Sequence, residues 1–348
     1  MAAEPSSPAA GISRRTGLLG AVRCFVLFVL GLGATSAVLT AYAPFPHLGN
    51  LWRKYHHVRE HGADYSLIYI GSSRVFHEFI PEQFDAALAA QGHEVTSFNF
   101  GQDGMWPPES FYMLREILKA PPPKLRWVLI DLMGIKPDVD ENGESLRSVY
   151  WHDFQHTWLA WRHTFEVDMD GQRTWAEKFQ RAWRHAELWM QESTGLGKGQ
   201  EQLEVVLKLS RKKKPPIVEQ RGFEPGGEGP LRGEMLETFT RAVERLKTNP
   251  PPKPIQPALR DGLESLIADV RAAGAEPIFV VAAGIFAAER FSDWPSAGVR
   301  VLRFDDPHRY PELYDPARRY DPHHLDALGA QAFTRRLAEQ FAETLGKP

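Results

Sequence analysis

Two short segments near opposite ends of the chain carry residue types that together could perform acyl transfer. Ser72 and Ser73 directly follow the apolar run 67–70. Near the other end, Asp321 precedes His324 by three residues, so one turn of chain can present both side chains in the same direction. A serine hydroxyl becomes a nucleophile when a histidine removes its proton and a carboxylate orients that histidine. The chain therefore holds the parts of a serine–histidine–acid site, if the fold brings them together.

The surroundings of the serines favour this use. The run 67–70 is β-branched and aromatic and ends at Gly71, which is typical of a buried strand followed by a sharp turn. Ligands of open parallel sheets bind just outside the carboxyl ends of the strands, where Ser73 would lie. The alternative for Ser72 and Ser73 is a hydroxyl that only caps the next helix. For His324 the alternative is a hydrogen bond at a helix end.

Strand-like and helix-like segments alternate along two parts of the chain. Strands are predicted at 67–70, 95–100, 125–132, 276–283 and 299–304, and helices at 81–91, 108–118, 257–273 and 325–345. This alternation predicts an α/β fold of the flavodoxin-like, three-layer type, with a parallel sheet in the order 2-1-3-4-5. That order places a topological switch point beside Ser73.

The alternation stops between the third and fourth predicted strands. Helices are predicted there at 175–192 and 231–246, with a flexible loop between them that contains a basic run at 211–214 and a glycine-rich run at 222–229. The basic run is expected to be solvated, with contact to a membrane or an anionic polymer as the alternative. Most of the tryptophans of this region are expected in a core: Trp151, Trp158, Trp161, Trp175, Trp183 and Trp189.

The N-terminal region has the pattern of a membrane segment. Three arginines, the last of them Arg23, precede the uncharged stretch 24–43, which as a helix would be about 30 Å long. The arginines predict that the N-terminus stays in the cytoplasm and the remainder crosses the membrane. A cleaved signal peptide is the alternative, because 41–43 (Ala-Tyr-Ala) resembles a cleavage site, although Pro44 follows it directly.

These patterns divide the chain into five parts. They are a cytoplasmic N-terminus (1–23), a transmembrane anchor (24–43), a connector (44–63), an α/β domain (64–134 and 255–348) and a helical insertion (135–254).

The composition argues against several classes of protein. The formal net charge of −3 gives no basic field for nucleic acid. The single cysteine, Cys24, can form neither a disulfide within the chain nor a cysteine-based metal site. Asp131, at the end of the third predicted strand, has no neighbouring His, Asp or Glu at metal-ligand spacing. No metal and no cofactor are therefore expected.

In their order along the chain, these motifs resemble those of the SGNH (GDSL-like) hydrolase superfamily. The first motif of that family, Gly-x-Ser after the first strand, is matched by Gly71-Ser72-Ser73. The resemblance implies that Ser73 is the nucleophile and that its backbone N–H is one oxyanion donor. The second motif, an asparagine five residues before a glycine, is matched by Asn99 and Gly104. It implies that the N–H of Gly104 also faces the oxyanion.

The last motif of the family is Asp-x-x-His, which Asp321 and His324 match. The resemblance implies that His324 is the general base and that Asp321 orients it. His323, which is out of spacing, is the competing base.

The third motif departs from the family pattern. Members usually have Gly-x-Asn-Asp after the third strand, and the side chain of that asparagine donates to the oxyanion. Ile135 stands in its place and cannot donate. Removing one such donor costs roughly 3–4 kcal/mol of transition-state stabilisation. Either the insertion supplies a substitute, or the site is weak or inactive. The nearest polar candidates are Asn142, Arg147, Tyr150 and His152.

Three further side chains are candidate substrate contacts: Arg74, Asn99 and Arg147. Arg74 is expected to pair either with an anionic substrate or with Asp103, and the sequence does not separate these two roles.

Three features narrow the resemblance to SGNH-like proteins that act on extracytoplasmic polysaccharides. They are the departure in the third motif, the sequence Gly-Ser-Ser-Arg in the first motif, and the predicted membrane anchor. These include relatives in alginate acetylation and teichoic-acid alanylation, often paired with a membrane-bound O-acyltransferase. The resemblance implies an O-acyl esterase or acyltransferase held in the inner membrane, with its catalytic domain outside the cytoplasm. Its ligand would be an acylated glycan or an acyl donor. The alternatives are a plain secreted esterase or lipase, and an inactive module that binds glycan or scaffolds an acyltransferase.

Overall fold

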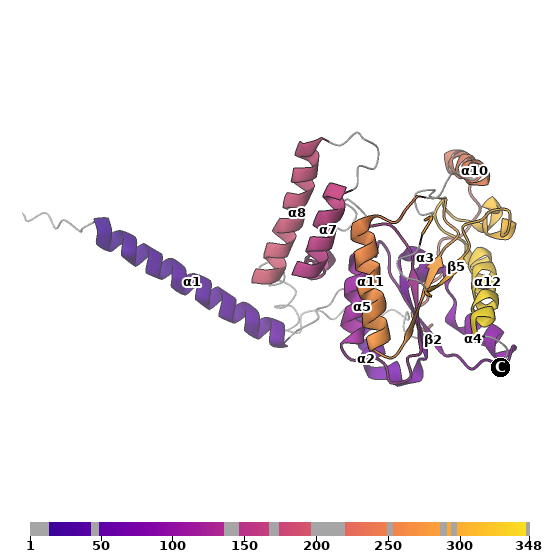
Figure 1. Ribbon diagram of the computed structural model, residues 1–348, viewed down its shortest axis with the longest axis horizontal. Coiled ribbons are helices and arrows are strands. Elements are labelled where there is room, and N and C mark those ends of the chain that lie inside the picture. The colour runs from indigo at the N-terminus through magenta and orange to yellow at the C-terminus, as the bar shows by residue number, and fades with distance from the viewer. Residues whose placement is uncertain are drawn as a thin grey trace, which may run out of the picture.

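The computed structural model describes residues 14–42, 49–135, 146–166, 174–195, 220–248, 253–285, 291–293 and 298–345. Figure 1 shows a sheet with helices packed around it, a helical hairpin formed by α7 and α8 at one side, and the long helix α1 extending away from both.

The sheet has five parallel strands. They are β1 (Leu67–Gly71), β2 (Ser97–Gly101), β3 (Trp127–Asp131), β4 (Glu276–Val281) and β5 (Arg300–Arg303). Their order is β2-β1-β3-β4-β5, which confirms the predicted α/β fold and strand order. Gly71 pairs with Gly101, so the chain leaves β1 and β2 at the same level of the sheet. The turns after these two strands are therefore neighbours.

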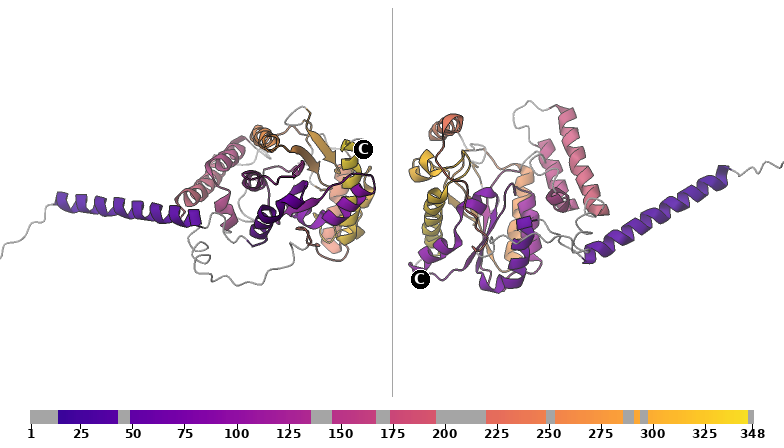
Figure 2. Two further views of the ribbon diagram at one scale, coloured as in Figure 1. Left: turned by 90° about the horizontal axis from the view of Figure 1, so that it is seen from below. Right: turned by 180° about the vertical axis from the view of Figure 1, so that it is seen from behind.

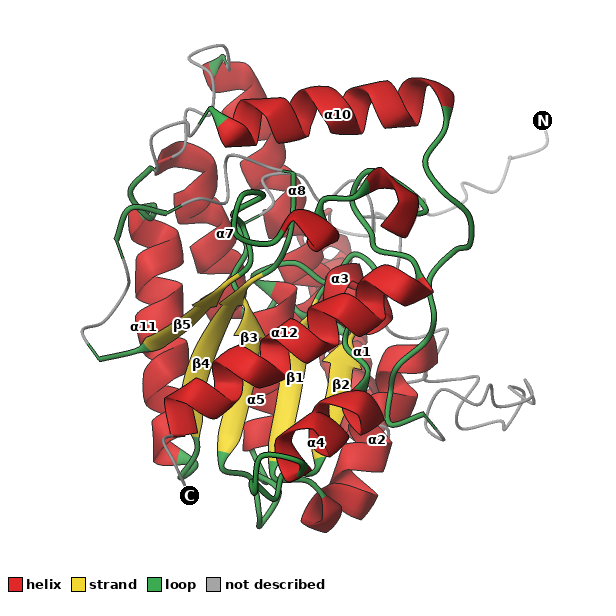
Figure 3. Ribbon diagram, turned by 90° about the vertical axis from the view of Figure 1, so that its right-hand side faces the viewer, coloured by secondary structure: helices red, strands yellow, loops and turns green. Residues whose placement is uncertain are grey.

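Helices cover both faces of the sheet, as Figure 3 shows for the face under α12 and α4. Side chains of β1 alternate between the two cores, with Ile68 and Ile70 on one face and Leu67 and Tyr69 on the other. The first core is closed by α2 (Gly49–His61), α5 (Glu109–Leu118) and α11 (Pro257–Ala272). The second is closed by α3 (Ser73–Glu78), α4 (Pro81–Ala89), α10 (Gly233–Lys247) and α12 (Ala327–Leu345). Burial on both faces explains why β1, most of β3 and most of β4 read as continuous apolar runs.

The stretch expected to be a polar connector, 44–63, contains α2, which packs into the first core. Leu51 and Val58 are buried in that core. Lys54 is also fully buried, and its Nζ donates to the carbonyl of Gly101 at the end of β2 at 2.5 Å. The helix is amphipathic, and its few apolar residues are spaced to face the sheet. The connector is thus part of the sheet domain.

The expected helical region between β3 and β4 is present in the described residues. It holds α6 (Leu146–Tyr150), α7 (Phe154–Glu166), α8 (Trp175–Thr194) and α10. The helices predicted at 175–192 and 231–246 correspond to α8 and α10. α8 starts with a capping box between Thr174 and Glu177 and ends at Gly195 in the left-handed conformation. α7 packs on both α8 and α11. The basic run 211–214 lies outside the described residues.

The N-terminal helix α1 covers Arg14–Tyr42. Its stretch Leu19–Val38 is long and apolar enough to cross a membrane, and a signal sequence has the same properties. Its described side chains are exposed to solvent or nearly so. The apolar stretch starts five residues earlier than expected because it includes Arg23, the one charged residue within it. Ala43 and Pro44 lie outside the described residues.

Candidate functional site

The turn after β1 gives its two serines different roles. Ser72 is the N-cap of α3, and its Oγ accepts from the backbone N–H of Arg74 at 3.3 Å. The same hydroxyl donates to Oδ2 of Asp131 at 2.9 Å. Ser73, the first residue of α3, points elsewhere. The capping alternative therefore describes Ser72, and it leaves Ser73 available for chemistry.

The structure brings Ser73, His324 and Asp321 into one chain of contacts. Ser73 Oγ lies 2.6 Å from His324 Nε2, and His324 Nδ1 lies 2.7 Å from Asp321 Oδ2. An ionised carboxylate can only accept, so Nδ1 carries the proton that faces Asp321. In the neutral ring, Nε2 is then free of hydrogen and can accept the proton of the serine hydroxyl. This is the arrangement that the spacing of Asp321 and His324 predicts.

Asp321 is held in place by more than the imidazole. Its Oδ1 accepts the backbone N–H groups of His323 at 2.7 Å and His324 at 2.9 Å. Burial opposes ionisation of Asp321, but the hydrogen bond from His324 and these backbone bonds outweigh it and lower the pKa of the carboxyl. Asp321 accepts the backbone N–H of His323 and bonds the ring of His324, so this geometry favours His324 as the candidate base.

His324 is supported by residues that the sequence analysis did not single out. Glu78, fully buried in α3, accepts the backbone N–H of Leu325 at 3.0 Å. The ring of Tyr320 lies parallel to the imidazole of His324, with 5.6 Å between centroids. Gly226 and Gly227 lie so close to the Tyr320 ring that a Cβ at either position would collide with it.

The glycine-rich run 222–229, expected in a flexible loop, is therefore a packed segment of the structure. Arg221 accepts the backbone N–H of Asn99 at 2.9 Å, so the segment lies along the edge strand β2. Glu224 donates its backbone N–H to Phe76 in α3. We call residues 220–227 the strap, because they run from β2 across α3 to Tyr320. The absence of side chains at Gly226 and Gly227 allows this close approach.

Gly104 lies in the turn after β2, next to the turn that holds Ser73. The N–H of Gln102 donates to Gly71 and that of Met105 to Gln102, both at 3.1 Å. Gly104 has a φ of 62°, which favours glycine at the third position of such a turn. Asp103 accepts from His77 Nε2 at 2.9 Å. Burial lowers the pKa of His77, but its bonds to Asp103 and the Glu224 carbonyl outweigh burial and raise it overall.

Arg147, predicted as a candidate substrate contact, has its guanidinium bonded to protein groups. Its guanidinium donates twice to the carboxylate of Glu109, at 2.8 and 2.9 Å, and once to the backbone carbonyl of Asp103 at 2.8 Å. Glu109 is buried, so this bidentate pair is shielded from water. Arg147 therefore braces the turn that contains Gly104.

Asn99, another such candidate, which lies in β2, is likewise bonded to protein groups. It is fully buried in β2, and its Nδ2 donates to the carbonyls of Val75 at 2.7 Å and Phe79 at 2.8 Å. Its Oδ1 accepts the N–H of Gly101. These bonds satisfy the carbonyls of Val75, inside α3, and of Phe79, its C-cap residue, and they occupy the buried amide. Asn99 therefore ties α3 to β2 and fixes the height of Ser73 above the sheet.

Arg74 faces Asp131, not Asp103. Its Nη2 lies 3.7 Å from Asp131 Oδ1, and its side chain is only 6% exposed. Asp131 thus accepts from Ser72 and pairs with Arg74. The described residues contain no group of three His, Cys, Asp or Glu side chains that could hold a metal ion.

A pocket of about 200 Å3 opens beside Ser73 and His324. Its polar lining comes from Ser72, Ser73, Arg74, His323 and His324, and its apolar lining comes from Trp106, Met133 and Ile285. Gly104 and Gly284 complete it. Ser73, His324 and the guanidinium-bearing Arg74 thus line the same small space.

None of the described candidates for the missing oxyanion donor lines this pocket. Ile135 is buried in the first core, which agrees with its inability to donate. Tyr150 is buried in the same core. His152 is fully buried, with its Nδ1 against the carbonyl of Ser148 and its Nε2 2.9 Å from Nδ1 of His185. Asn142 lies outside the described residues.

The buried pair His152 and His185 predicts a loss of stability in acid. Burial, assisted by repulsion from His163 and Arg181, lowers the pKa of His185 from 6.5 to about 4, and burial also lowers the pKa of His152 well below 6.5. Below pH 6.5 the unfolded chain takes up protons that the folded chain does not. Stability therefore falls as pH falls toward 4, by about 3 kcal/mol for His185 alone.

Urea unfolding at several pH values between about 7 and 4.5 measures this loss. His185→Gln should make the free energy of unfolding fall less steeply over that range. His61→Gln, at an exposed position of α2, is the matched control and should leave the slope of wild type unchanged. Equal slopes for wild type and His185→Gln would contradict the assignment.

Comparison with known proteins gives no independent assignment, because no family model and no curated protein matches the chain. The candidate function therefore depends on the geometry of the site.

Proposed function

We propose that this protein is a membrane-anchored serine esterase or acyltransferase of the SGNH type that acts on acyl groups of a cell-surface glycan. The observation that carries the proposal is the contact chain from Ser73 Oγ through the His324 imidazole to Asp321. The parallel sheet with Ser73 at the carboxyl end of β1 supports it, because that edge is where such sheets bind ligands.

The first half of the reaction forms an acyl-enzyme. Ser73 Oγ attacks the ester carbonyl carbon while His324 Nε2 takes the hydroxyl proton, and Asp321 stabilises the resulting imidazolium. The tetrahedral intermediate then expels the alcohol, which leaves with the proton from His324. In the second half, water or a sugar hydroxyl gives its proton to His324 and attacks the acyl carbon. The bond from that carbon to Ser73 Oγ then breaks, and His324 returns the proton to Ser73 Oγ. Hydrolysis and transfer differ only in this acceptor.

The developing oxyanion needs donors near Ser73. In the proposal, the backbone N–H groups of Ser73 and Gly104 supply two, and the Arg147–Glu109 pair supports the turn that presents Gly104. Ile135 offers no third donor, and Arg74 is the cation that lines the pocket. We propose that Arg74 partly replaces the missing amide by placing positive charge beside the intermediate.

One observation favours a second function. Because Ile135 is buried in the core, the side-chain donor of the third family motif is absent. A loss of roughly 3–4 kcal/mol would leave a slow enzyme. The second proposal is therefore a module that binds acylated glycan, or scaffolds a membrane-bound acyltransferase, without turnover of its own.

Labelling with a fluorophosphonate probe, which traps activated serines covalently, separates the two functions. Covalent incorporation that depends on Ser73 supports the enzyme, and its absence in folded protein supports the binding module.

The location predicted from the sequence is tested separately. We expect α1 to be retained as an anchor and the sheet domain to lie outside the cytoplasmic membrane. Protease added to intact spheroplasts should then digest the domain while a cytoplasmic marker protein stays intact. Protection of the domain from the added protease would place it in the cytoplasm, and the predicted orientation would be wrong. An intact mass that matches a chain starting after residue 43 would instead identify α1 as a cleaved signal peptide.

A further inference from the structure

The α7–α8 hairpin exposes an unusual number of large apolar side chains. They are Phe154, Trp158, Trp175, Phe179, Trp183, Trp189 and Met190. The expectation that most tryptophans of this region lie in a core is wrong for four of them, although Trp151 is buried as expected. Trp175, Phe179 and Trp183 are 68%, 62% and 62% exposed, and their spacing of four places them on one face of α8.

This exposed stripe is separate from the face by which α8 packs. The buried side chains of α8 are Lys178, Ala182, His185 and Leu188, which lie on another side of the helix. α7 continues the stripe, because the ring of Phe165 lies 5.7 Å from that of Phe179 and 6.4 Å from that of Trp175. We call Phe154, Trp158, Trp175, Phe179, Trp183 and Met190 the aromatic face. Apolar patches of this kind on a folded protein mark interaction surfaces.

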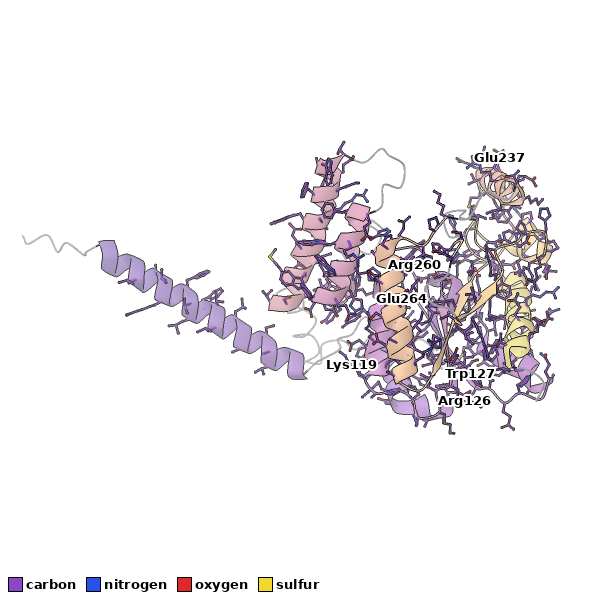
Figure 4. The ribbon with its side chains drawn as sticks, viewed as in Figure 1. Lys119, Arg126, Trp127, Glu237, Arg260 and Glu264 are labelled. Carbon is purple, nitrogen blue, oxygen red and sulfur yellow. The ribbon has the colours of Figure 1, made fainter. Side chains whose placement is uncertain are left out.

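The carboxyl end of the hairpin also touches the apolar helix α1 at one point. Gly195, which ends α8, touches the side chain of Ser36 so closely that a Cβ on residue 195 would collide with it. Ser36 belongs to the stretch Leu19–Val38, near its carboxyl end. Figures 1 and 2 show α7 and α8 running steeply across the direction of α1. Figure 4 shows side chains of α8 projecting away from the sheet, on the side from which α1 extends.

We propose that the aromatic face lies in the interfacial layer of a lipid bilayer and seats the sheet domain on the membrane that α1 spans. This inference rests on the anchor part of the proposed function. If α1 spans the bilayer, a helix that crosses α1 steeply runs along the membrane surface. The contact with Ser36 places the carboxyl end of α8 at the depth where the apolar stretch of α1 ends. Tryptophan favours this layer because its ring is apolar and its N–H is polar.

The chemistry of the hairpin favours the lipid interface over a site for anionic polymer. Arg162, Arg181 and Arg184 are balanced by acidic residues such as Glu177 and Glu187 on the same two helices. Trp183 directs its Nε1 to Glu187, as an amphipathic ring at a water boundary does. Binding should therefore depend on apolar contact, with little dependence on anionic lipid.

The tryptophans themselves report on this contact, because α1 contains none. The full chain, with residues 1–43 verified by intact mass, is reconstituted in phosphatidylcholine vesicles with or without bromine on the acyl chains. Bromine quenches tryptophan emission only at close range. We expect strong quenching in wild type, and stronger quenching by bromine near the headgroups than by bromine near the bilayer centre.

Two matched pairs of substitutions locate the contact. Phe179→Glu with Met190→Glu puts charge into the aromatic face, keeps every tryptophan, and should reduce the quenching several-fold. Met235→Glu with Leu328→Glu makes the same change at exposed apolar positions of α10 and α12 and should leave the quenching as in wild type. All four positions are exposed, so the variants should fold, which circular dichroism verifies.

Four outcomes would overturn the inference. Equal quenching for wild type and Phe179→Glu/Met190→Glu would remove the aromatic face from the bilayer. The wild-type chain could instead form a dimer in detergent, show no quenching in vesicles, and dissociate into monomers when Phe179→Glu and Met190→Glu are introduced. That result would assign the aromatic face to contact with a second copy of the chain. Loss of α1 from the mature chain would overturn the anchor and this inference together, whereas a retained α1 without quenching would overturn the inference alone.

Discussion

Ser73→Ala should abolish covalent labelling by the fluorophosphonate probe and lower acyl transfer roughly 10^6-fold, to the level left by substrate binding and the oxyanion donors. The physical reason is that Ser73 Oγ, 2.6 Å from His324 Nε2, is the atom that would form the acyl bond. Alanine removes that atom and leaves no hydroxyl in its place. The measurement is the rate of release of a chromogenic short-chain ester, together with probe labelling.

The chain supplies its own controls for this prediction. Ser72→Ala changes the adjacent hydroxyl, which caps α3 and bonds Asp131, so it should cost roughly 1 kcal/mol of stability and keep labelling. His324→Ala should lower the rate about as far as Ser73→Ala, whereas His323→Ala should act far less. The Ser73→Ala/His324→Ala double variant should be little worse than either single one, because the residues act as a unit.

Wild-type activity in Ser73→Ala would contradict the catalytic assignment. Labelling that survives in Ser73→Ala and disappears in Ser72→Ala would move the nucleophile to its neighbour. Folded wild-type protein that takes up no probe would support the binding module.

Asp321→Asn should lower acyl transfer roughly 10^4-fold at neutral pH while the fold remains intact. The carboxylate now accepts from His324 Nδ1 and from two backbone N–H groups. An asparagine oxygen can keep the backbone bonds, but its amide then turns an N–H toward Nδ1. This favours the tautomer with the proton on Nε2, which cannot accept from Ser73. The loss should appear in kcat, with little change in KM.

Asp326→Asn is the matched control, because Asp326 lies five residues away and caps α12 through the N–H of Gly329 at 2.8 Å. Asparagine caps a helix as well as aspartate does, so activity and stability should stay near those of wild type. If Asp321→Asn kept full activity, the imidazole would have to be oriented by another group, and the contact with Tyr320 would be the next candidate.

The sheet was predictable because four of its strands, β1 to β4, are buried on both faces. Such strands tend to be apolar runs bounded by glycine and proline, and 127–130, between Pro123 and Gly134, is a clear example. The contact of Ser73 with His324 followed from the same topology, since both had to lie near the carboxyl edge of the sheet. The agreement covers positions only, and the catalytic roles remain predictions until they are tested.

The corrections concern residues whose partners are remote in sequence. Nothing near Asn99 or Arg147 indicates that one bonds the carbonyls of α3 and the other a glutamate in α5. A polar residue that braces a site and one that binds a ligand have the same local pattern. Likewise, apolar residues at helical spacing, such as Trp175 and Phe179, do not reveal whether protein or another medium covers them.

The strap has a consequence for how this protein could be rebuilt. Its ends belong to the region between β3 and β4, yet its glycines hold Tyr320 against the imidazole of His324. Insertions are often treated as detachable modules that can be exchanged between homologues or trimmed from expression vectors. Exchanging this insertion would also remove the strap, and with it part of the packing that supports His324. A chimera would preserve the site only if its new segment also returned to Tyr320 without side chains at the two contact positions.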